Sequence, residues 1–79
     1  MKTETRAIKN LSKQVRQLRL DKDLTQEECA ARAGIATVYL SGVERGVRNP
    51  TVKVLARLAD ALDVEISALF KRPPRSTGR

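Results

Sequence analysis

Residues 25–46 constrain this chain most, because they read as two short helices joined by a tight turn at Gly34. Thr25 can accept a hydrogen bond from the backbone N–H of Glu28, whose carboxylate can reach back to the N–H of Thr25 in a capping box. Small apolar residues then allow one face of this helix to pack closely: Cys29, Ala30 and Ala33. Gly34 can take up a left-handed backbone conformation without steric cost, so we expect the first helix to end there.

The second helix is expected over about residues 36–45, with one apolar and one polar side. Leu40 and Val43 lie three residues apart and face inward, whereas the outer face carries Thr37, Val38 and Ser41. Glycine inside a helix costs roughly 1 kcal/mol relative to alanine, so Gly42 indicates close approach by a backbone or a neighbouring helix. Neutral change at a tolerant position is the alternative explanation. Together the two helices have the outline of a helix-turn-helix, which points to double-stranded DNA.

The rest of the chain also reads as helical, which predicts an all-α fold of five helices. Apolar residues recur every three or four positions from about Thr5 to Lys22: Ile8, Leu11, Val15 and Leu18. Pro50 disfavours helix at the residue before it, and Thr51 can cap a fourth helix. The apolar stripe of that helix is Val52, Leu55, Leu58, Ala59 and Leu62. A short fifth helix near residues 65–70 presents Ile66, Leu69 and Phe70.

Composition excludes several kinds of site. The chain has 79 residues, no histidine and a single cysteine, so it has no internal disulfide and no ligand set for zinc. We expect Cys29 in the core, in a reducing compartment, and we assign no metal or cofactor. No histidine, P-loop glycine pattern or paired-carboxylate cleft is present, so an enzyme is not expected and no catalytic residue is assigned.

The sequence also gives no reason to expect a membrane partner. No apolar run approaches the ~20 residues that a membrane-spanning helix needs, and the N-terminus does not resemble a signal peptide. We therefore expect a cytoplasmic protein that is associated with the nucleoid when it is bound to DNA.

The net charge of +7 is distributed unevenly along the chain. Residues 1–22 carry seven Lys or Arg and two acidic residues, residues 23–70 carry five and seven, and residues 71–79 carry four and none. A cationic surface must therefore come from the first helix and the C-terminal tail, with local additions from Arg45, Arg48 and Lys53. The first helix contributes Lys9, Lys13 and Arg16, for which a solvated helix face and phosphate contact are about equally plausible. We expect one domain over residues 1–70 and a basic, flexible tail over residues 71–79.

Residues 11–70 resemble the DNA-binding domain of the phage-repressor family, known as Cro/cI or XRE. The Thr-Gln-Glu-Glu start at residue 25, the Gly34 turn and the Glu-Arg-Gly ending at residue 46 follow in the order and spacing of that family. Residues 39–51, Tyr-Leu-Ser-Gly-Val-Glu-Arg-Gly-Val-Arg-Asn-Pro-Thr, are most similar to the controller proteins of restriction–modification systems.

The resemblance implies a five-helix, lambda-repressor-like domain with its helix-turn-helix at the second and third helices. It implies a sequence-specific transcriptional regulator that binds a palindromic operator as a homodimer, with RNA polymerase as a candidate partner. The alternative left open is an antitoxin or protein-interaction module whose DNA binding is secondary.

The resemblance also assigns roles to individual residues. An unpaired Glu44 would oppose the helix dipole, so a cationic partner is expected, and the family pattern identifies it as Arg19. Phosphate contacts fall to Gln26, Tyr39, Ser41 and Asn49, with Lys53 as a nearby cation. Tyr39 could instead be half-buried against the fourth helix.

Base reading falls to Thr37 and Val38, with Arg48 reaching from the following loop, where it can donate two hydrogen bonds to a guanine. Many relatives carry Arg, Gln or Asn at the two helix positions, so direct readout from this helix is expected to be weak. Specificity then depends on Arg48 and on the deformability of the DNA between half-sites. The dimer interface is expected to use the fourth and fifth helices, with candidates that could instead belong to the monomer core: Ile66, Leu69 and Phe70.

Overall fold

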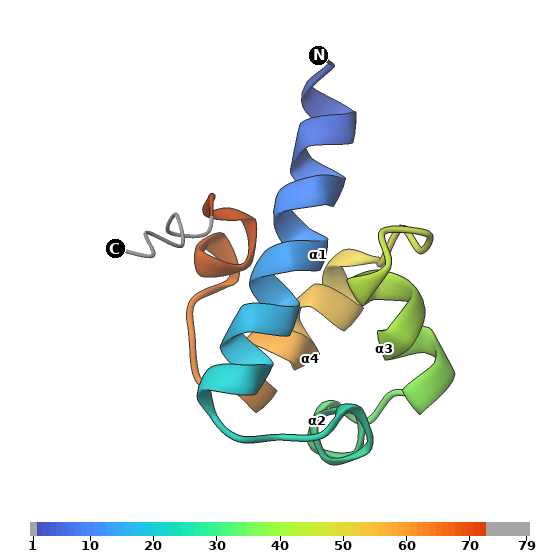
Figure 1. The fold of residues 1–79 in the computed structure, drawn as a ribbon, viewed down its shortest axis with the longest axis vertical. Coiled ribbons are helices and arrows are strands. Elements are labelled where there is room, and N and C mark those ends of the chain that lie inside the picture. The colour runs from blue at the N-terminus through green and yellow to red at the C-terminus, as the bar shows by residue number, and fades with distance from the viewer. Residues whose placement is uncertain (1, 73–79) are drawn as a thin grey trace.

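The computed structural model describes residues 2–72, and in this range it contains four α-helices, one short 3-10 helix and no strand (Figure 1). The elements are α1 (Thr3–Asp21), α2 (Gln26–Ala33), α3 (Thr37–Glu44), α4 (Val52–Leu62) and η1 (Ile66–Phe70). The all-α prediction is confirmed, but the expected fifth α-helix is a 3-10 helix. The segment has only five residues, and 3-10 geometry is used in such short pieces and connectors rather than in long helices. Of the expected tail, residues 73–79 lie outside the described residues.

The helix-turn-helix begins and ends as its local sequence dictates. The Thr25 hydroxyl accepts from the N–H of Glu28 at 3.0 Å, and the Glu28 carboxylate accepts from the N–H of Thr25 at 2.8 Å, which completes the capping box. The hydrogen bond from the Thr25 backbone is the main reason that the pKa of Glu28 is lowered. Gly34 has φ +69°, and the N–H of Ile35 closes the turn on the carbonyl of Ala30.

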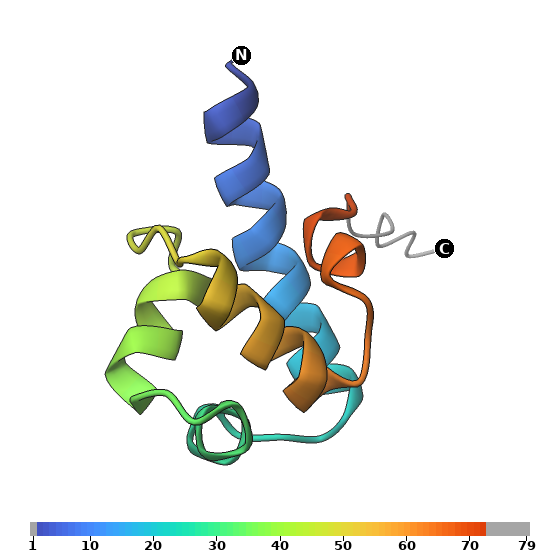
Figure 2. The same ribbon diagram turned by 180° about the vertical axis from the view of Figure 1, so that it is seen from behind.

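One apolar core joins all five elements. Its fully buried large side chains come from α1, α3, α4 and η1: Val15, Leu40, Val43, Leu58, Leu62 and Leu69. Cys29 is also fully buried, as expected, and burial raises the pKa of its thiol. Seen from behind in Figure 2, α4 crosses α1, and η1 packs on both helices.

Val52 departs from the expected apolar stripe of α4, because its side chain is 74% exposed. It is the first residue of the helix after its N-cap, Thr51, and the buried residues of α4 begin one turn later at Leu55. The 3.6-residue period thus places Val52 on the correct face, but the core does not extend to that end of the helix.

The long helix α1 packs against α3, α4 and η1. Leu11 and Val15 are buried as predicted, and Ile8 and Leu18 are half-buried. The first turns of α1 project beyond the other elements (Figure 1). Within residues 2–72, no helix combines the length and the apolar character needed to cross a bilayer.

Candidate DNA interface

An ion pair braces α3, the second helix of the helix-turn-helix, against α1. Arg19 donates from Nε to Oε2 of Glu44 at 2.7 Å and from Nη2 to Oε1 at 2.9 Å, so the two side chains meet through two parallel hydrogen bonds. Their side chains are only 9% and 3% exposed. The pair expected from the resemblance is therefore present in the structure, and it joins residues 25 positions apart.

Arg19 makes a further hydrogen bond near the end of α1. Its Nη1 donates to the carbonyl of Leu24 at 2.8 Å and so fixes the connection between α1 and α2. The hydrogen bond to Glu44 raises the pKa of Arg19, and this outweighs burial, which would lower it. Arg19 therefore remains a permanent cation that ties α1, the connection after it and α3 together.

Gln26 is joined to the same brace. Its side-chain amide donates to Oε1 of Glu44 at 3.1 Å, so this carboxylate oxygen accepts from both Arg19 and Gln26. Gln26 is the first residue of α2 and is half-buried. One N–H of its amide is engaged by Glu44, and the other can serve a second acceptor. Sequence reasoning assigned Gln26 to phosphate contact but missed its link to Glu44, which lies 18 positions away.

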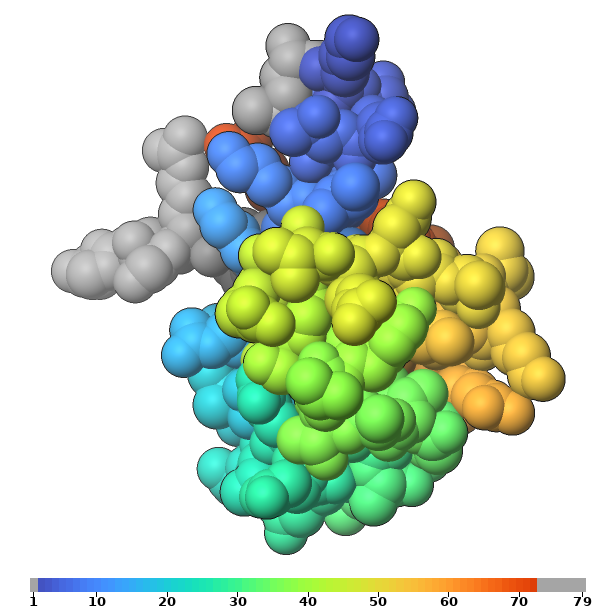
Figure 3. All heavy atoms as spheres, turned by 90° about the vertical axis from the view of Figure 1, so that its right-hand side faces the viewer, coloured from blue at the N-terminus to red at the C-terminus, as the bar shows by residue number. Residues whose placement is uncertain are grey.

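The outer edge of α3 is open to solvent. Val38 is 69% exposed and Thr37 is exposed, whereas Leu40 and Val43 on the opposite face are buried. In Figure 3, α3 and the loop after it (green to yellow) stand in front on one face of the molecule, with α2 below them. This face presents a helix edge that a groove of DNA could receive.

The end of α3 is tied by a Schellman motif. Gly46 has φ +75°, its N–H donates to the carbonyl of Val43 at 3.1 Å, and the N–H of Val47 donates to the carbonyl of Gly42 at 2.9 Å. The chain then turns back, and Arg48 lies against α3. The close approach expected at Gly42 is therefore real, but a side chain, that of Arg48, makes it rather than a backbone or a helix.

The remaining candidate phosphate contacts are spread around α3. Tyr39 is half-buried and packs against the core, and its ring centroid lies 5.7 Å from the guanidinium carbon of Arg48. Ser41 is half-buried, and Asn49 and Lys53 are exposed in the loop after α3 and at the start of α4. Their contacts with phosphate stay predictions.

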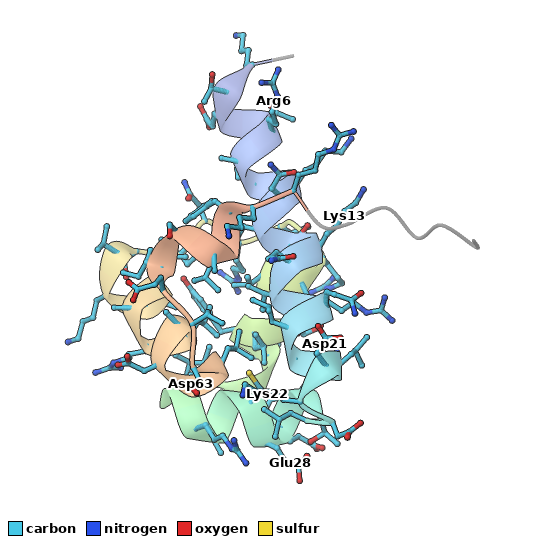
Figure 4. All side chains as sticks on the ribbon, turned by 90° about the vertical axis from the view of Figure 1, so that its left-hand side faces the viewer. Arg6, Lys13, Asp21, Lys22, Glu28 and Asp63 are labelled. Atoms are coloured by element: carbon cyan, nitrogen blue, oxygen red, sulfur yellow. The ribbon has the colours of Figure 1, made fainter. Side chains whose placement is uncertain are left out.

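Cations of α1 line the side of the molecule next to the end of α3. Lys9 and Lys13 share a surface hollow of about 390 Å³ with Arg45, and Arg16 lines a neighbouring hollow with Lys13. Lys13 points away from the body of the protein in Figure 4. Within residues 2–72, Lys9, Lys13 and Arg16 form no ion pair with an acidic side chain. Both a solvated face and phosphate contact therefore stay possible roles for them.

The candidates for the dimer interface differ in exposure. Ile66 is 39% exposed and Phe70 is half-buried, so both offer apolar surface. Leu69 is fully buried in the monomer core, which is the second of the two roles that the sequence left open for it. The 3-10 turn of η1 points this residue inward between α1 and α4.

An apolar side chain that sequence reasoning did not assign also lies just after α3. Val47 is 65% exposed in the loop between Gly46 and Arg48. An isolated exposed valine is common on protein surfaces, so its type alone gave no signal.

Among residues 2–72, no group of three or more His, Cys, Asp or Glu side chains could hold a metal ion.

Comparison with known proteins agrees with this geometry. The HTH_3 helix-turn-helix family matches residues 15–69. The chain is 60% identical over 47 residues to the uncharacterized HTH-type transcriptional regulator y4dJ of Sinorhizobium fredii, an alignment that covers 60% of this chain and 61% of the relative. It is 33% identical over 61 residues to the HTH-type transcriptional regulator SinR of Bacillus subtilis, covering 76% of this chain and 55% of SinR. The matched segment thus spans only about half to three-fifths of these relatives.

Two solved structures also resemble this chain, and the match covers more of their length than of the sequence relatives. The restriction-modification controller protein C.AhdI from Aeromonas hydrophila has a TM-score of 0.77 and 40% identity, covering 80% of this chain and 96% of that protein. The controller protein C.Esp1396I has a TM-score of 0.74 and 33% identity, covering 81% and 84%. With the exposed edge of α3 braced by a buried ion pair, and with matches of this extent, the chain belongs to the HTH_3 helix-turn-helix family and is similar to restriction-modification controller proteins and to HTH-type transcriptional regulators.

Proposed function

We propose that this chain binds a two-fold symmetric operator as a homodimer, with the outer edge of each α3 in a major groove. The observation that carries the proposal is the exposed edge of Thr37 and Val38, beside two donors that are already held in place. Gln26 is anchored by Glu44, and Arg48 lies against Gly42. Donors fixed before binding cost little entropy when DNA arrives.

In this arrangement the roles divide by chemistry. The Val38 methyl groups suit a thymine methyl, and Arg48 can donate to the two acceptors of a guanine. Hydroxyl, amide and ammonium groups around the helix suit backbone phosphates: Gln26, Tyr39, Ser41, Asn49 and Lys53. Because Thr37 and Val38 offer no bidentate base contact, specificity rests on Arg48 and on DNA deformability.

The argument for a dimer is the small size of α3. The eight residues of α3 make a helix about 12 Å long, which reads only a few base pairs. Two copies placed ~34 Å apart would occupy successive major grooves and double the site. The apolar surface of Ile66 and of the half-buried Phe70, both on η1, supports an interface built on this element.

The class of target genes is proposed from two proteins of similar structure. C.AhdI and C.Esp1396I are restriction-modification controller proteins, and this chain shares 40% and 33% of the aligned residues with them. We propose the same class of target here. A nuclease footprint upstream of its own reading frame and of neighbouring restriction–modification genes would support this, whereas footprints confined to unrelated promoters would contradict it.

Selection from randomised duplexes tests DNA recognition. We expect enrichment of an inverted repeat whose half-site centres lie roughly 10 base pairs apart. Enrichment of no sequence at moderate salt would refute the proposal.

Sedimentation tests the dimer separately. The wild type should sediment as a dimer at high micromolar concentration, and Ile66→Asp should shift it to monomer. Leu20→Asp is the matched control, because Leu20 is similarly exposed, at 44%, but lies on α1. A wild-type monomer, or equal effects of both variants, would remove η1 from the interface.

A further inference from the structure

Gly42 occupies a helical position that gives no conformational reason for glycine. It lies inside α3, where glycine is the least favourable residue apart from proline. Its φ is not in the left-handed region, in contrast to Gly34 and Gly46. The explanation must therefore be space rather than backbone conformation.

That space is filled by one side chain. A Cβ atom added at position 42 would lie 2.5 Å from Cγ of Arg48, 3.4 Å from its Nε and 3.5 Å from its Cδ. These are the three nearest heavy atoms that the added Cβ would meet, and all belong to Arg48. The stem of Arg48 thus rests on the bare backbone of Gly42, and any side chain there would displace it.

Two further contacts fix Arg48 on this spot. The N–H of Val47, the residue before it, donates to the carbonyl of Gly42 itself at 2.9 Å, so the loop is anchored where Arg48 lands. The guanidinium carbon then lies 5.7 Å from the centroid of the Tyr39 ring, within the range of a cation–π contact. The anchored backbone of Val47, the bare surface of Gly42 and the ring of Tyr39 together hold the long side chain of Arg48 in one place.

We propose that Gly42 is a positioning residue for base recognition: it forms the floor on which Arg48 is pre-ordered toward DNA. The inference rests on the proposed DNA-binding function of α3. An arginine that is ordered before binding loses less side-chain entropy on binding than a free one. A side chain at position 42 would instead release Arg48 from the surface of α3, although the helix itself would remain intact.

The first test uses the free protein and needs no DNA. In the wild type, the side-chain proton resonances of Arg48 should be shifted by the ring current of Tyr39, and Gly42→Ala should return them toward the values of a free arginine. Arg48 resonances that are unshifted in the wild type, or unchanged by Gly42→Ala, would overturn the proposal. This experiment shows whether Gly42 orders Arg48 even if the wild type binds no specific DNA. Absence of specific binding would contradict the proposed function but not the ordering of Arg48 by Gly42.

The second test is a binding cycle of Gly42→Ala and Arg48→Ala on a duplex selected by the wild type. Gly42→Ala should weaken binding roughly tenfold and relax the preference at the base pair that Arg48 reads. In the Arg48→Ala background, the same substitution should change the Kd by less than about twofold, because there is no longer an arginine to displace. Equal losses in both backgrounds would overturn the proposal.

Thermal unfolding tests whether Gly42→Ala weakens binding only because it destabilises the fold. In the Arg48→Ala background, Gly42→Ala should raise the unfolding temperature, because alanine favours the helix over glycine. A fall in unfolding temperature in that background would mean that something other than Arg48 meets the new methyl group, and the proposal would be wrong.

Discussion

Removing one partner of the Arg19–Glu44 pair should destabilise the domain strongly, because the remaining charge would stay in a nearly dry site. The two side chains are 9% and 3% exposed and are joined by hydrogen bonds of 2.7 and 2.9 Å. Breaking a buried ion pair on one side costs about 3–5 kcal/mol. The pair lies at the margin of the core, where water can enter after truncation, so we expect about 3 kcal/mol for Glu44→Ala. Arg19→Ala should cost at least as much, because it also leaves the carbonyl of Leu24 without its donor.

These losses can be measured within the stability of such a small domain. For 79 residues the free energy of unfolding is about 4–12 kcal/mol, and each kcal/mol lowers the unfolding temperature by about 4–8 °C. Each single variant should therefore unfold more than ten degrees below the wild type. The double variant should lose about 3–4 kcal/mol rather than the sum of the two. Denaturant unfolding of all four proteins gives the coupling energy, and additivity within about 0.5 kcal/mol would refute the pairing argument.

Four further outcomes are expected. Gly34→Ala should destabilise by about 1 kcal/mol through backbone strain alone, since φ is +69° and an added methyl group meets nothing within 4 Å; an unchanged denaturation midpoint would contradict this. The pKa of Glu28 is lowered in the folded state, so its contribution is present above its ordinary pKa of 4.5 and is lost as the pH falls through the lower folded value. Between pH 6 and pH 3 the unfolding temperature should therefore fall further for the wild type than for Glu28→Gln, and equal falls would count against the capping box. Gln14→Met should stabilise by about 1 kcal/mol, because the buried Oε1 of Gln14 has no hydrogen-bond partner; a lower unfolding temperature would show that this oxygen is satisfied in solution. Cys29 is fully buried and burial raises the pKa of its thiol, so a thiol reagent should reach it only when the domain opens, and fast reaction in the native state would exclude a closed core.

The parts of the fold that could be predicted are those that neighbouring residues determine. The capping box at Thr25 and the left-handed turn at Gly34 depend on contacts within one helical turn, and both are found as expected. The bounds of α3, Thr37–Glu44, also agree with the expected range to within one residue at each end. Local hydrogen bonding therefore determines where this motif starts and stops.

The parts that could not be predicted depend on which distant segments meet. Val52 has the correct helical phase but lies beyond the edge of the core, and for Leu69 the sequence left both the interface and the monomer core open, of which the structure shows the core. Composition cannot decide such cases, because burial is a property of the packed assembly of helices. The same holds for Gln26, whose contact with Glu44 spans 18 positions.

The candidate site shows the same division. The edge formed by Thr37 and Val38 was visible in the helical pattern and is exposed. The partner of Glu44 came from resemblance to a family, since no spacing rule connects it to Arg19. Gly42 was conspicuous as a glycine inside a helix, but only the structure identifies Arg48 as the group that needs the space.

Site-specific cross-linking from position 38 tests the central claim most directly. A photoreactive residue replacing Val38, at the exposed edge of α3, should cross-link to bases in the major groove of a selected duplex. The same residue at Ser67, which is exposed on η1, is the control and should give no cross-link to DNA bases. Efficient base cross-links from position 38 alone are the predicted result. Their absence in a complex that binds the duplex specifically, or cross-links from position 67 instead, would contradict recognition through α3.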